Sequence, residues 1–271
     1  MASRKRLRFL LAFFLIVGGL YYLGKSPAPG FSHSQISSTL APRAEWAIPA
    51  PSPVEKEQLE QIFSKPFKFL GEGAQAFAFE SSDEKYVLKF FKMRRFTPSW
   101  QDCLCPHVVK RRLKNLKWVF NGYKIGYDEF RKETGLVFIH LAKTDHLKQK
   151  VIVLDEKGHE HQIDLDKTEF ILQEKAELIF HRLAKLYAEG NVAKAEKAIA
   201  SVLDLVKLRV TKGYADRDKA VSNNYGFVGD KAIQLDIGRL YQGAPKKGGK
   251  ERQLQHVKKR IDRWKRENIQ A

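Results

Sequence analysis

Hydrophobic and polar positions divide the chain into segments with different periodicities. The run from Phe9 to Gly24 carries no charge, whereas short stretches after residue 66 alternate apolar and polar residues, which is typical of β-strands. Strands are predicted over 67–70, 77–80, 86–91, 150–154, 159–165, 169–173 and 232–235. Apolar residues at helical spacing predict helices over 177–189 and 191–211 and a final helix near the C-terminus. The pattern predicts an α+β fold.

The uncharged run 9–24 is predicted to be a transmembrane helix. It is slightly shorter than the roughly 20 residues that span a bilayer, but Arg8 and Lys25 at its ends can extend to the headgroups. A cleaved signal peptide is the alternative, and Ser26-Pro27-Ala28 followed by Pro29 is a poor cleavage site. The basic residues 1–8 precede the run, so we expect a single-pass protein with a cytoplasmic N-terminus and an extracytoplasmic or luminal body.

Residues 25–53 are predicted to be a spacer between this anchor and the folded part. The segment is rich in proline and serine, which disfavour regular helix and favour an extended chain. Folded structure is expected to begin near Val54. We divide it into an N-terminal part, residues 54–175, and a reduced C-terminal part, residues 176–271, joined by a hinge near 174–176.

The net charge of +18 is concentrated in three segments. Residues 1–8, 92–117 and 245–271 carry +4, +7 and +7, and the remaining chain is neutral. A neutral body does not have the basic surface of a nucleic-acid-binding protein, so no specific nucleic acid is expected as a partner. Basic clusters near a membrane anchor suit anionic lipid headgroups, at roughly 1 kcal/mol per base close to the surface. Nucleic-acid binding is the alternative for the clusters alone, and a solvated helix face is the alternative for the last one.

The first candidate chemistry lies between residues 67 and 91. Lys89 occupies the middle of a predicted strand, on a face that it shares with two apolar residues. A cation there is costly unless it is paired or lies beside a surface cleft. Gly71 and Gly73 follow the first strand, and a turn without side chains can bring backbone N–H groups close to a phosphate. Taken alone, two glycines in a hairpin are more often a simple turn, and a lone lysine in a strand is more often solvated.

A second group of polar residues follows the long helices. Asp218 comes soon after the helix over 191–211, and Asn223 follows it five residues later. Gly229-Asp230 predicts a tight hairpin turn, and Asp236 directly follows the second strand of this hairpin, over 232–235. Carboxylate and amide oxygens suit Mg²⁺. Each of these residues taken separately is also common in turns.

In order and spacing, these motifs resemble those of the protein-kinase-like superfamily. Asp216-Arg217-Asp218 is similar to the His-Arg-Asp of the catalytic loop, Asn223 has the spacing of the metal-binding Asn, and Asp236-Ile237-Gly238 resembles Asp-Phe-Gly. Gly71-Glu72-Gly73 resembles the glycine-rich loop, and Tyr86-Val87-Leu88-Lys89 resembles the third-strand lysine motif. The resemblance implies a two-lobed fold, with an antiparallel sheet in the N-lobe and a reduced helical C-lobe, behind the transmembrane helix.

The resemblance also implies ATP and Mg²⁺ as cofactors and gives each residue a role. Lys89 would contact the phosphates under the loop of Gly71 and Gly73, and Asp218 would accept a proton or align the acceptor. Asn223 and Asp236 would hold the metal. A carboxylate should orient Lys89, and Glu129 and Glu133 stand four apart on one predicted helical face. Glu133 is preferred, because it lies beside the apolar face, and Glu129 is the alternative.

The departures from the family's pattern limit the function. Only 33 residues follow Gly238, Ala76 stands at the third loop glycine, and no Ala-Pro-Glu segment is found. The sequence therefore disfavours a conventional protein kinase. It favours a divergent membrane-anchored member with a truncated C-terminal lobe that binds Mg-ATP and transfers phosphate to a small-molecule, lipid or glycolipid acceptor. The alternative is a catalytically inactive pseudokinase scaffold or a module that binds membranes or polyanions.

Overall fold

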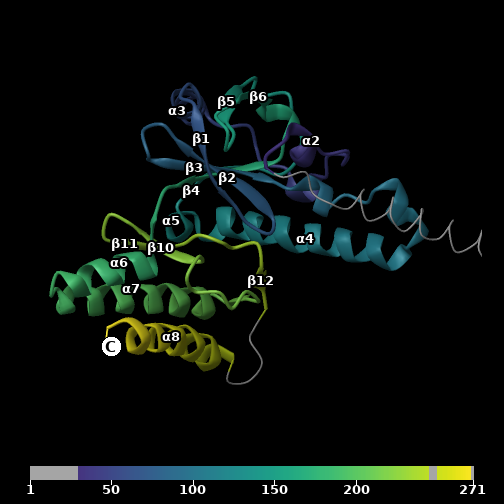
Figure 1. Ribbon diagram of the computed structural model, residues 1–271. Coiled ribbons are helices and arrows are strands. Elements are labelled where there is room, and N and C mark those ends of the chain that lie inside the picture. The colour runs from purple at the N-terminus through teal and green to yellow at the C-terminus, as the bar shows by residue number, and fades with distance from the viewer. Residues whose placement is uncertain (1–29, 244–248, 270–271) are drawn as a thin grey trace, which may run out of the picture. The chain divides into compact units, whose positions relative to one another are not determined.

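The computed structural model describes residues 30–243 and 249–269 (Figure 1). The expected anchor over 9–24 and the basic residues 1–8 lie outside the described residues. Within the described ranges, no helix is long and apolar enough to cross a membrane. The chain from His33 onward forms one compact unit. It is an α+β structure with one curled mixed sheet, two smaller sheets and helices.

The largest sheet has seven strands in the order β4-β7-β3-β2-β1-β5-β6. All neighbours are antiparallel except β1 and β5, which pair in parallel through Phe67 and Val153. The expectation of an antiparallel sheet was therefore wrong. The chain crosses from β4, at one edge of the sheet, to β5, which pairs with β1 in parallel. The strands are β1 (Phe67–Glu72), β2 (Ala76–Ser81), β3 (Tyr86–Phe91), β4 (Leu136–His140), β5 (Lys150–Leu154), β6 (Glu160–Asp164) and β7 (Phe170–Glu174).

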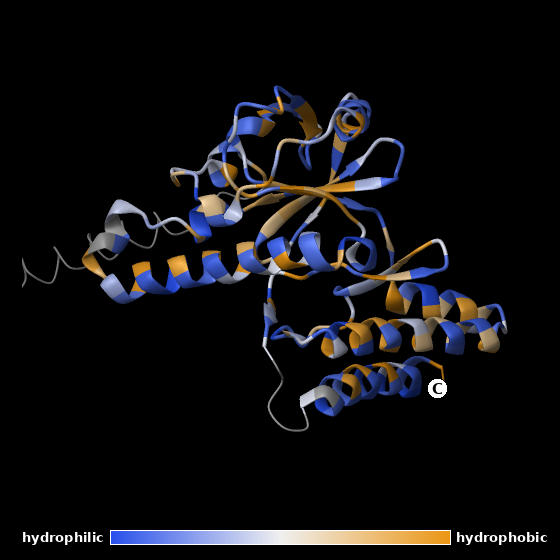
Figure 2. Ribbon diagram, turned by 180° about the vertical axis from the view of Figure 1, so that it is seen from behind, coloured by the Kyte–Doolittle hydropathy of each residue, from blue (hydrophilic) through white to orange (hydrophobic). Residues whose placement is uncertain are grey.

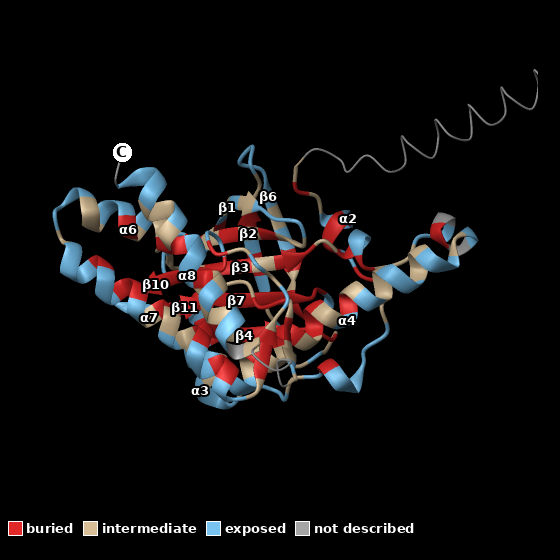
Figure 3. Cartoon of the chain, turned by 90° about the horizontal axis from the view of Figure 1, so that it is seen from below, coloured by how far each residue is buried: buried red, intermediate tan, exposed pale blue. Residues whose placement is uncertain are grey.

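One long helix, α4 (Pro106–Glu129), packs against the sheet with only its second half. Its buried residues lie between Leu116 and Gly126, while the half that begins at Pro106 extends outward and contains only half-buried and exposed residues (Figure 3). The basic segment 92–117 does not form one element. Its first part contains the short turns η2 (Met93–Arg95) and η3 (Trp100–Leu104), and its second part is the outward half of α4.

The C-terminal elements form a second apolar core. One face each of α6 (Ile179–Ala188) and α7 (Val192–Thr211) is apolar (Figure 2), and α8 (Gly249–Asn268) adds Val257 and Ile261 to the same cluster. The predicted tight turn is present, with Gly229 at a φ of 56° between the two strands of the hairpin. The strands here are β8 (Glu177–Leu178), β9 (Tyr214–Asp216), β10 (Tyr225–Val228), β11 (Lys231–Gln234) and β12 (Leu240–Gln242), ordered β11-β10-β8 and β12-β9.

Part of the predicted spacer belongs to the folded unit. From His33 onward it contains α2 (His33–Ile36) and the turn η1 (Ala44–Trp46), and it then enters α3 (Pro53–Phe63). The Trp46 side chain is 2% exposed, and its ring meets Phe120 edge-on at a centroid distance of 4.9 Å. Its Nε1 donates a hydrogen bond to Asn121 Oδ1 at 2.8 Å. The prolines do prevent a long helix here, but the large apolar residues between them anchor the segment to α4, so folded structure begins before Val54.

Replacing Trp46 with Phe should therefore destabilise the folded unit. The variant loses the indole hydrogen bond to Asn121 and part of the buried ring, which together are worth about 1–2 kcal/mol of unfolding free energy. Urea denaturation of the full chain measures this loss. Trp100→Phe is the matched control, because Trp100 is 79% exposed, and it should change the unfolding free energy little. Equal effects of the two substitutions would show that the segment is a free spacer.

Candidate functional site

The candidate site begins with Lys89, in the interior of β3. Its Nζ donates to Gln173 Oε1 at 2.7 Å and to the carbonyl oxygen of Leu235 at 3.2 Å. Among the described residues Lys89 forms no ion pair. Burial lowers the pKa of Lys89, and the nearby Asp236 carboxylate partly offsets this shift. A half-buried ammonium held by neutral oxygens, without a salt bridge, is well suited to receive an anion.

Gln173 takes the place in which we expected a carboxylate. It lies opposite Val87 in the pairing of β3 with β7, two residues from Lys89, so both side chains are on one face. The Gln173 side chain is 1% exposed, and its Nε2 donates to the carbonyl oxygens of Thr134 at 2.6 Å and Leu235 at 3.3 Å. This glutamine was missed at the sequence level, although a polar residue among the apolar ones of β7 was a signal.

Glu133 does not contact Lys89, contrary to our expectation. The helix α4 ends at Glu129, Phe130 leaves helical geometry at a φ of −138°, and Glu133 lies on a separate short helix, α5 (Arg131–Thr134). Phe130 is buried and its ring meets Tyr214 edge-on at 5.1 Å, which turns the chain away from the axis of α4. Glu129 and Glu133 are thus not on one helical face. Glu129 is exposed.

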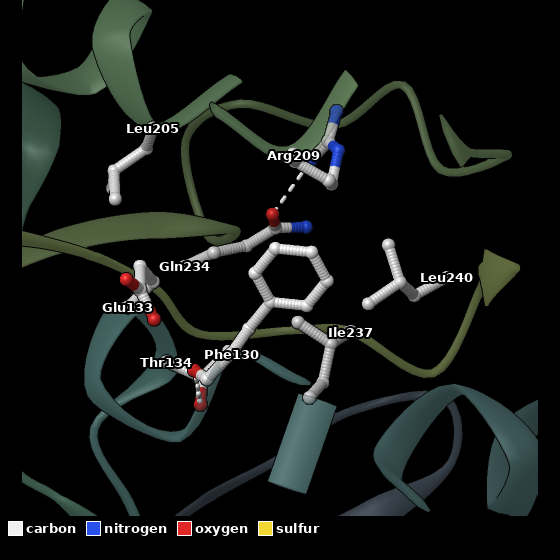
Figure 4. Close-up of a pocket in the computed structure, with 8 residues that line it drawn as sticks. All are labelled: Phe130, Glu133, Thr134, Leu205, Arg209, Gln234, Ile237 and Leu240. Carbon is white, nitrogen blue, oxygen red and sulfur yellow. Dashed lines mark hydrogen bonds between the residues drawn. The ribbon is translucent and has the colours of Figure 1, made fainter. Parts of the chain in front are cut away.

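Glu133 instead lines a small cavity of about 10 Å³, at the limit of what one water requires. Figure 4 shows this cavity, with Arg209 and Gln234 joined by a hydrogen bond in its wall. Its size excludes a nucleotide. The lining residues are Phe130, Glu133, Thr134, Leu205, Arg209, Gln234, Ile237 and Leu240.

Asp236 lies beside Lys89, as the resemblance implied. Its Oδ1 accepts from Gly238 N at 3.2 Å and from the Tyr123 hydroxyl at 3.5 Å. Burial, followed by the Asp236 charge, raises the pKa of Tyr123 well above its ordinary value, so this phenol stays a donor. Asp236 Oδ2 accepts no hydrogen bond from the described residues. One carboxylate oxygen is thus available for a cation.

Two glycines of α4 let this segment approach the helix. A Cβ on Gly122 would lie 2.3 Å from the carbonyl oxygen of Ile237, and one on Gly126 would lie 2.0 Å from the Ile237 side chain. The backbone of Asp236-Ile237-Gly238 can therefore rest on α4 only where the helix has no side chain. These residues were also missed at the sequence level. The sequence does contain a signal for them, because two glycines four residues apart interrupt an apolar helical face.

The glycine-rich turn folds toward the same segment. Gly73 N donates to the carbonyl oxygen of Ala76 at 2.9 Å, and the side chain of Gln75 reaches Gly238, where an added Cβ would lie 3.0 Å from Gln75 Oε1. At Gly71 an added Cβ would meet no atom within 4 Å. Packing within the described chain therefore does not account for the glycine at Gly71.

The residues of the expected catalytic loop are brought only partly together. Asp218 is half-buried, and its Oδ1 accepts from the Ala220 amide at 2.8 Å. Its Oδ2 accepts no hydrogen bond from the described residues. Asn223, the expected metal ligand, is exposed, while its neighbour Asn224 is 3% exposed and pairs with Leu235 through its backbone carbonyl. No cluster of three or more acidic, histidine or cysteine side chains suited to a metal is found among the described residues.

Asp216 anchors the base of this loop. Its Oδ1 accepts from the Asp218 amide at 2.8 Å and its Oδ2 from Gln234 Nε2 at 2.6 Å. Arg209 Nη1 donates to Gln234 Oε1 at 2.5 Å and lies 3.8 Å from the Asp216 carboxylate. Burial raises the pKa of Asp216 to about 6 although Arg209 opposes the shift, and the charges of Asp218 and Asp236 add to it.

Asp216 should make the stability of the protein depend on pH. Its pKa rises from 3.8 when unfolded to about 6 when folded, so the folded state retains the proton over this range. The unfolding free energy that Asp216 contributes is complete below pH 4 and falls by up to about 3 kcal/mol as the pH rises through 6. Urea titrations at pH 4 and pH 7 measure the unfolding free energy of wild type and of Asp216→Asn. The part of the decrease that is due to Asp216 should be missing in the variant. Parallel pH profiles of the two proteins would contradict the assignment.

Comparisons with known proteins find similarity in structure only. No family model matches the chain, and no curated protein matches its sequence. A structure of the bifunctional kinase-methyltransferase WbdD matches with a TM-score of 0.33 and 15% identity, over 62% of this chain and 30% of that one. A co-crystal structure of WbdD with a kinase inhibitor gives 0.34 and 15%, over 64% and 32%.

A third match is the complex of Rv3197 with erythromycin from Mycobacterium tuberculosis. Its TM-score is 0.34 at 10% identity, over 72% of this chain and 54% of that one. The chain thus spans between 30% and 54% of the length of these structures. At TM-scores this low, the matches carry no argument about function.

Proposed function

We propose that the chain binds Mg-ATP and is a membrane-anchored, atypical kinase-like protein that transfers phosphate to a small-molecule, lipid or glycolipid acceptor. The observation that carries the proposal is the position of Lys89. Its ammonium is in the interior of β3, has no ion pair among the described residues, and lies beside the Asp236 carboxylate. An anion bound together with a divalent cation would complement both charges.

The residues fit Mg²⁺ bound with nucleotide phosphates, and do not form a metal site of their own. Mg²⁺ is usually held by one or two carboxylates together with phosphates and waters, and Asp236 Oδ2 supplies one such ligand. Asn223, which is exposed, would be a second ligand only when nucleotide is bound. The metal would neutralise phosphate charge.

In the transfer step, the protein's own groups would position the reactants. Lys89 would bind the phosphates, and the turn with Gly71 and Gly73 would cover them. The acceptor oxygen forms a bond to the γ-phosphorus, the bond from that phosphorus to the bridging oxygen breaks, and ADP leaves. The proton of the acceptor hydroxyl passes to the Asp218 carboxylate.

The membrane part of the proposal concerns residues outside the described range. The uncharged run over 9–24 and the basic residues ahead of it favour a single-pass anchor with the N-terminus in the cytoplasm. The body would then need a compartment that contains nucleotide, such as a lumen of the secretory pathway, for turnover to occur. An inverted topology would also satisfy this need.

A pseudokinase is the second candidate, and two observations favour it. Glu133 does not pair with Lys89, which has neutral partners instead, and Asn223 is exposed. Such a site can hold nucleotide without aligning it for transfer. A module that binds membranes or polyanions through its basic segments is the remaining alternative.

Calorimetric titration of the full chain with Mg-ATP tests the proposal, followed by a search for γ-phosphate transfer to lipid, glycolipid and sugar acceptors. Binding with transfer supports the kinase, and binding without transfer supports the pseudokinase. Absence of binding at millimolar nucleotide contradicts both. If binding to anionic vesicles or RNA is the only interaction found, and falls with salt, the basic segments are the functional surface.

A further inference from the structure

A cluster of cations and aromatic rings includes Arg217, the residue that directly precedes the proposed catalytic Asp218 in the sequence. The ring of Trp118 on α4 has three cations over it: Lys114 Nζ at 4.7 Å, the Arg217 guanidinium at 5.2 Å and the Arg239 guanidinium at 5.3 Å from the ring centroid. Arg217 also stacks on Tyr241 at 3.8 Å. We call Lys114, Trp118, Arg217, Arg239 and Tyr241 the arginine cluster.

Three separate segments of the chain form the arginine cluster. Arg217 directly precedes Asp218, Arg239 directly follows Gly238, and Trp118 belongs to the helix that packs against both segments. The pairing of β9 with β12 holds the two arginines together, since Arg217 N donates to the carbonyl oxygen of Arg239 at 3.3 Å. In Figure 1, β12 runs past α4 where these elements meet. The fold, rather than a basic run in the sequence, creates this concentration of positive charge.

The cations of the arginine cluster, Lys114, Arg217 and Arg239, have no acidic partner at ion-pair distance among the described residues. Arg217 is exposed and Arg239 is half-buried, so both guanidinium groups are accessible. Aromatic faces offset part of the repulsion between three neighbouring cations, and an anion would offset more. Guanidinium groups bind phosphate oxygens in pairs with defined geometry, which a solvated lysine does not.

We propose that the arginine cluster binds a phosphate group on the acceptor. This inference rests on the proposed function, because a phosphate bound by the arginine cluster belongs to the acceptor only if Asp218 is the catalytic carboxylate. A phosphate held by Arg217 and Arg239 would place a hydroxyl of the same molecule near the Asp218 carboxylate. The acceptor is then a phosphorylated small molecule or the headgroup of an anionic phospholipid, which have this chemistry in common.

The experiment compares wild type with R217Q/R239Q in the full chain. Glutamine keeps much of the length and polarity of arginine but removes the charge. The probes are glycerol 3-phosphate, with glycerol as its uncharged control, and phosphatidylcholine vesicles with and without phosphatidylglycerol. K194Q/K197Q is the matched control, because it removes the same charge from exposed positions on α7, outside the basic segments.

Wild type should bind glycerol 3-phosphate, or gain vesicle binding when phosphatidylglycerol is present. The affinity for that probe should fall roughly tenfold or more in R217Q/R239Q, as expected for loss of charge-assisted phosphate contacts, and should not fall in K194Q/K197Q. The probe that responds identifies the source of the phosphate. Equal binding by wild type and R217Q/R239Q, or no phosphate-dependent binding by wild type, overturns the inference.

Titration of the same proteins with Mg-ATP separates the two proposals. R217Q/R239Q should bind Mg-ATP as wild type does, while Lys89→Ala should bind glycerol 3-phosphate as wild type does. If Mg-ATP binds and neither phosphate probe does, the acceptor inference alone fails. If no protein binds Mg-ATP but R217Q/R239Q loses the phosphate probe, the proposed function fails and the cluster remains an anion site without an acceptor role.

Discussion

An Asp218→Asn variant is expected to transfer phosphate about 100- to 10 000-fold more slowly than wild type while binding Mg-ATP with unchanged affinity. The physical reason is the free Oδ2 of Asp218, which accepts no hydrogen bond from the described residues. Oδ1 is already used by the Ala220 amide, and an asparagine can keep that bond through its own carbonyl oxygen. The substitution then removes the base and preserves the loop.

Initial rates with ATP labelled at the γ-phosphate measure this loss, and calorimetry measures the affinity. Asp204→Asn is the matched control, because Asp204 is an exposed carboxylate on α7 and should leave both quantities unchanged. A full rate in Asp218→Asn would remove Asp218 from the mechanism. A loss of Mg-ATP affinity equal to the loss of rate would instead assign Asp218 a role in binding.

Replacing Lys89 with Ala should weaken Mg-ATP binding roughly a hundredfold, because it removes a charge-assisted contact to the phosphates from a half-buried site. The folded state should survive, since the same change also removes the cost of burying an ammonium group. Lys89→Met is the second variant, because it keeps the volume of the side chain and therefore the packing of β3. Both should have the same defect in binding.

Lys85→Ala is the matched control for Lys89, since it removes an exposed lysine just before the same strand. It should bind Mg-ATP as wild type does. A Lys89→Met chain that folds and keeps wild-type affinity for Mg-ATP would show that Lys89 is a structural residue, held by Gln173 and the Leu235 carbonyl alone.

The strands near the site were predictable because their signals are local. Alternation of apolar residues gave the bounds of β3, and Gly229-Asp230 marked the turn between β10 and β11. Local signals also place Lys89 within β3 and Asp236 two residues after β11, whereas their proximity in space has no local signal. A final helix was also expected, and α8 confirms it.

The remaining features depend on contacts distant in sequence. Glu133 was expected beside Lys89 because a helical face was extended through Phe130, whereas burial of that ring against Tyr214 ends α4. Trp46 was assigned to a spacer because its neighbours are prolines, and only the position of α4 reveals its partner. The parallel pairing of β1 with β5 has no local signal either.

The central claim, that Lys89 and Asp236 together hold Mg-nucleotide, is tested most directly by thermal unfolding of the full chain with Mg-ATP. At a nucleotide concentration a hundred times the dissociation constant, wild type should gain about 2.7 kcal/mol, or roughly 5–10 °C in Tm. The gain should fall to about 0.4 kcal/mol in Lys89→Met, which binds about a hundredfold more weakly, and should depend on Mg²⁺. An unchanged Tm of wild type at millimolar Mg-ATP would contradict the claim.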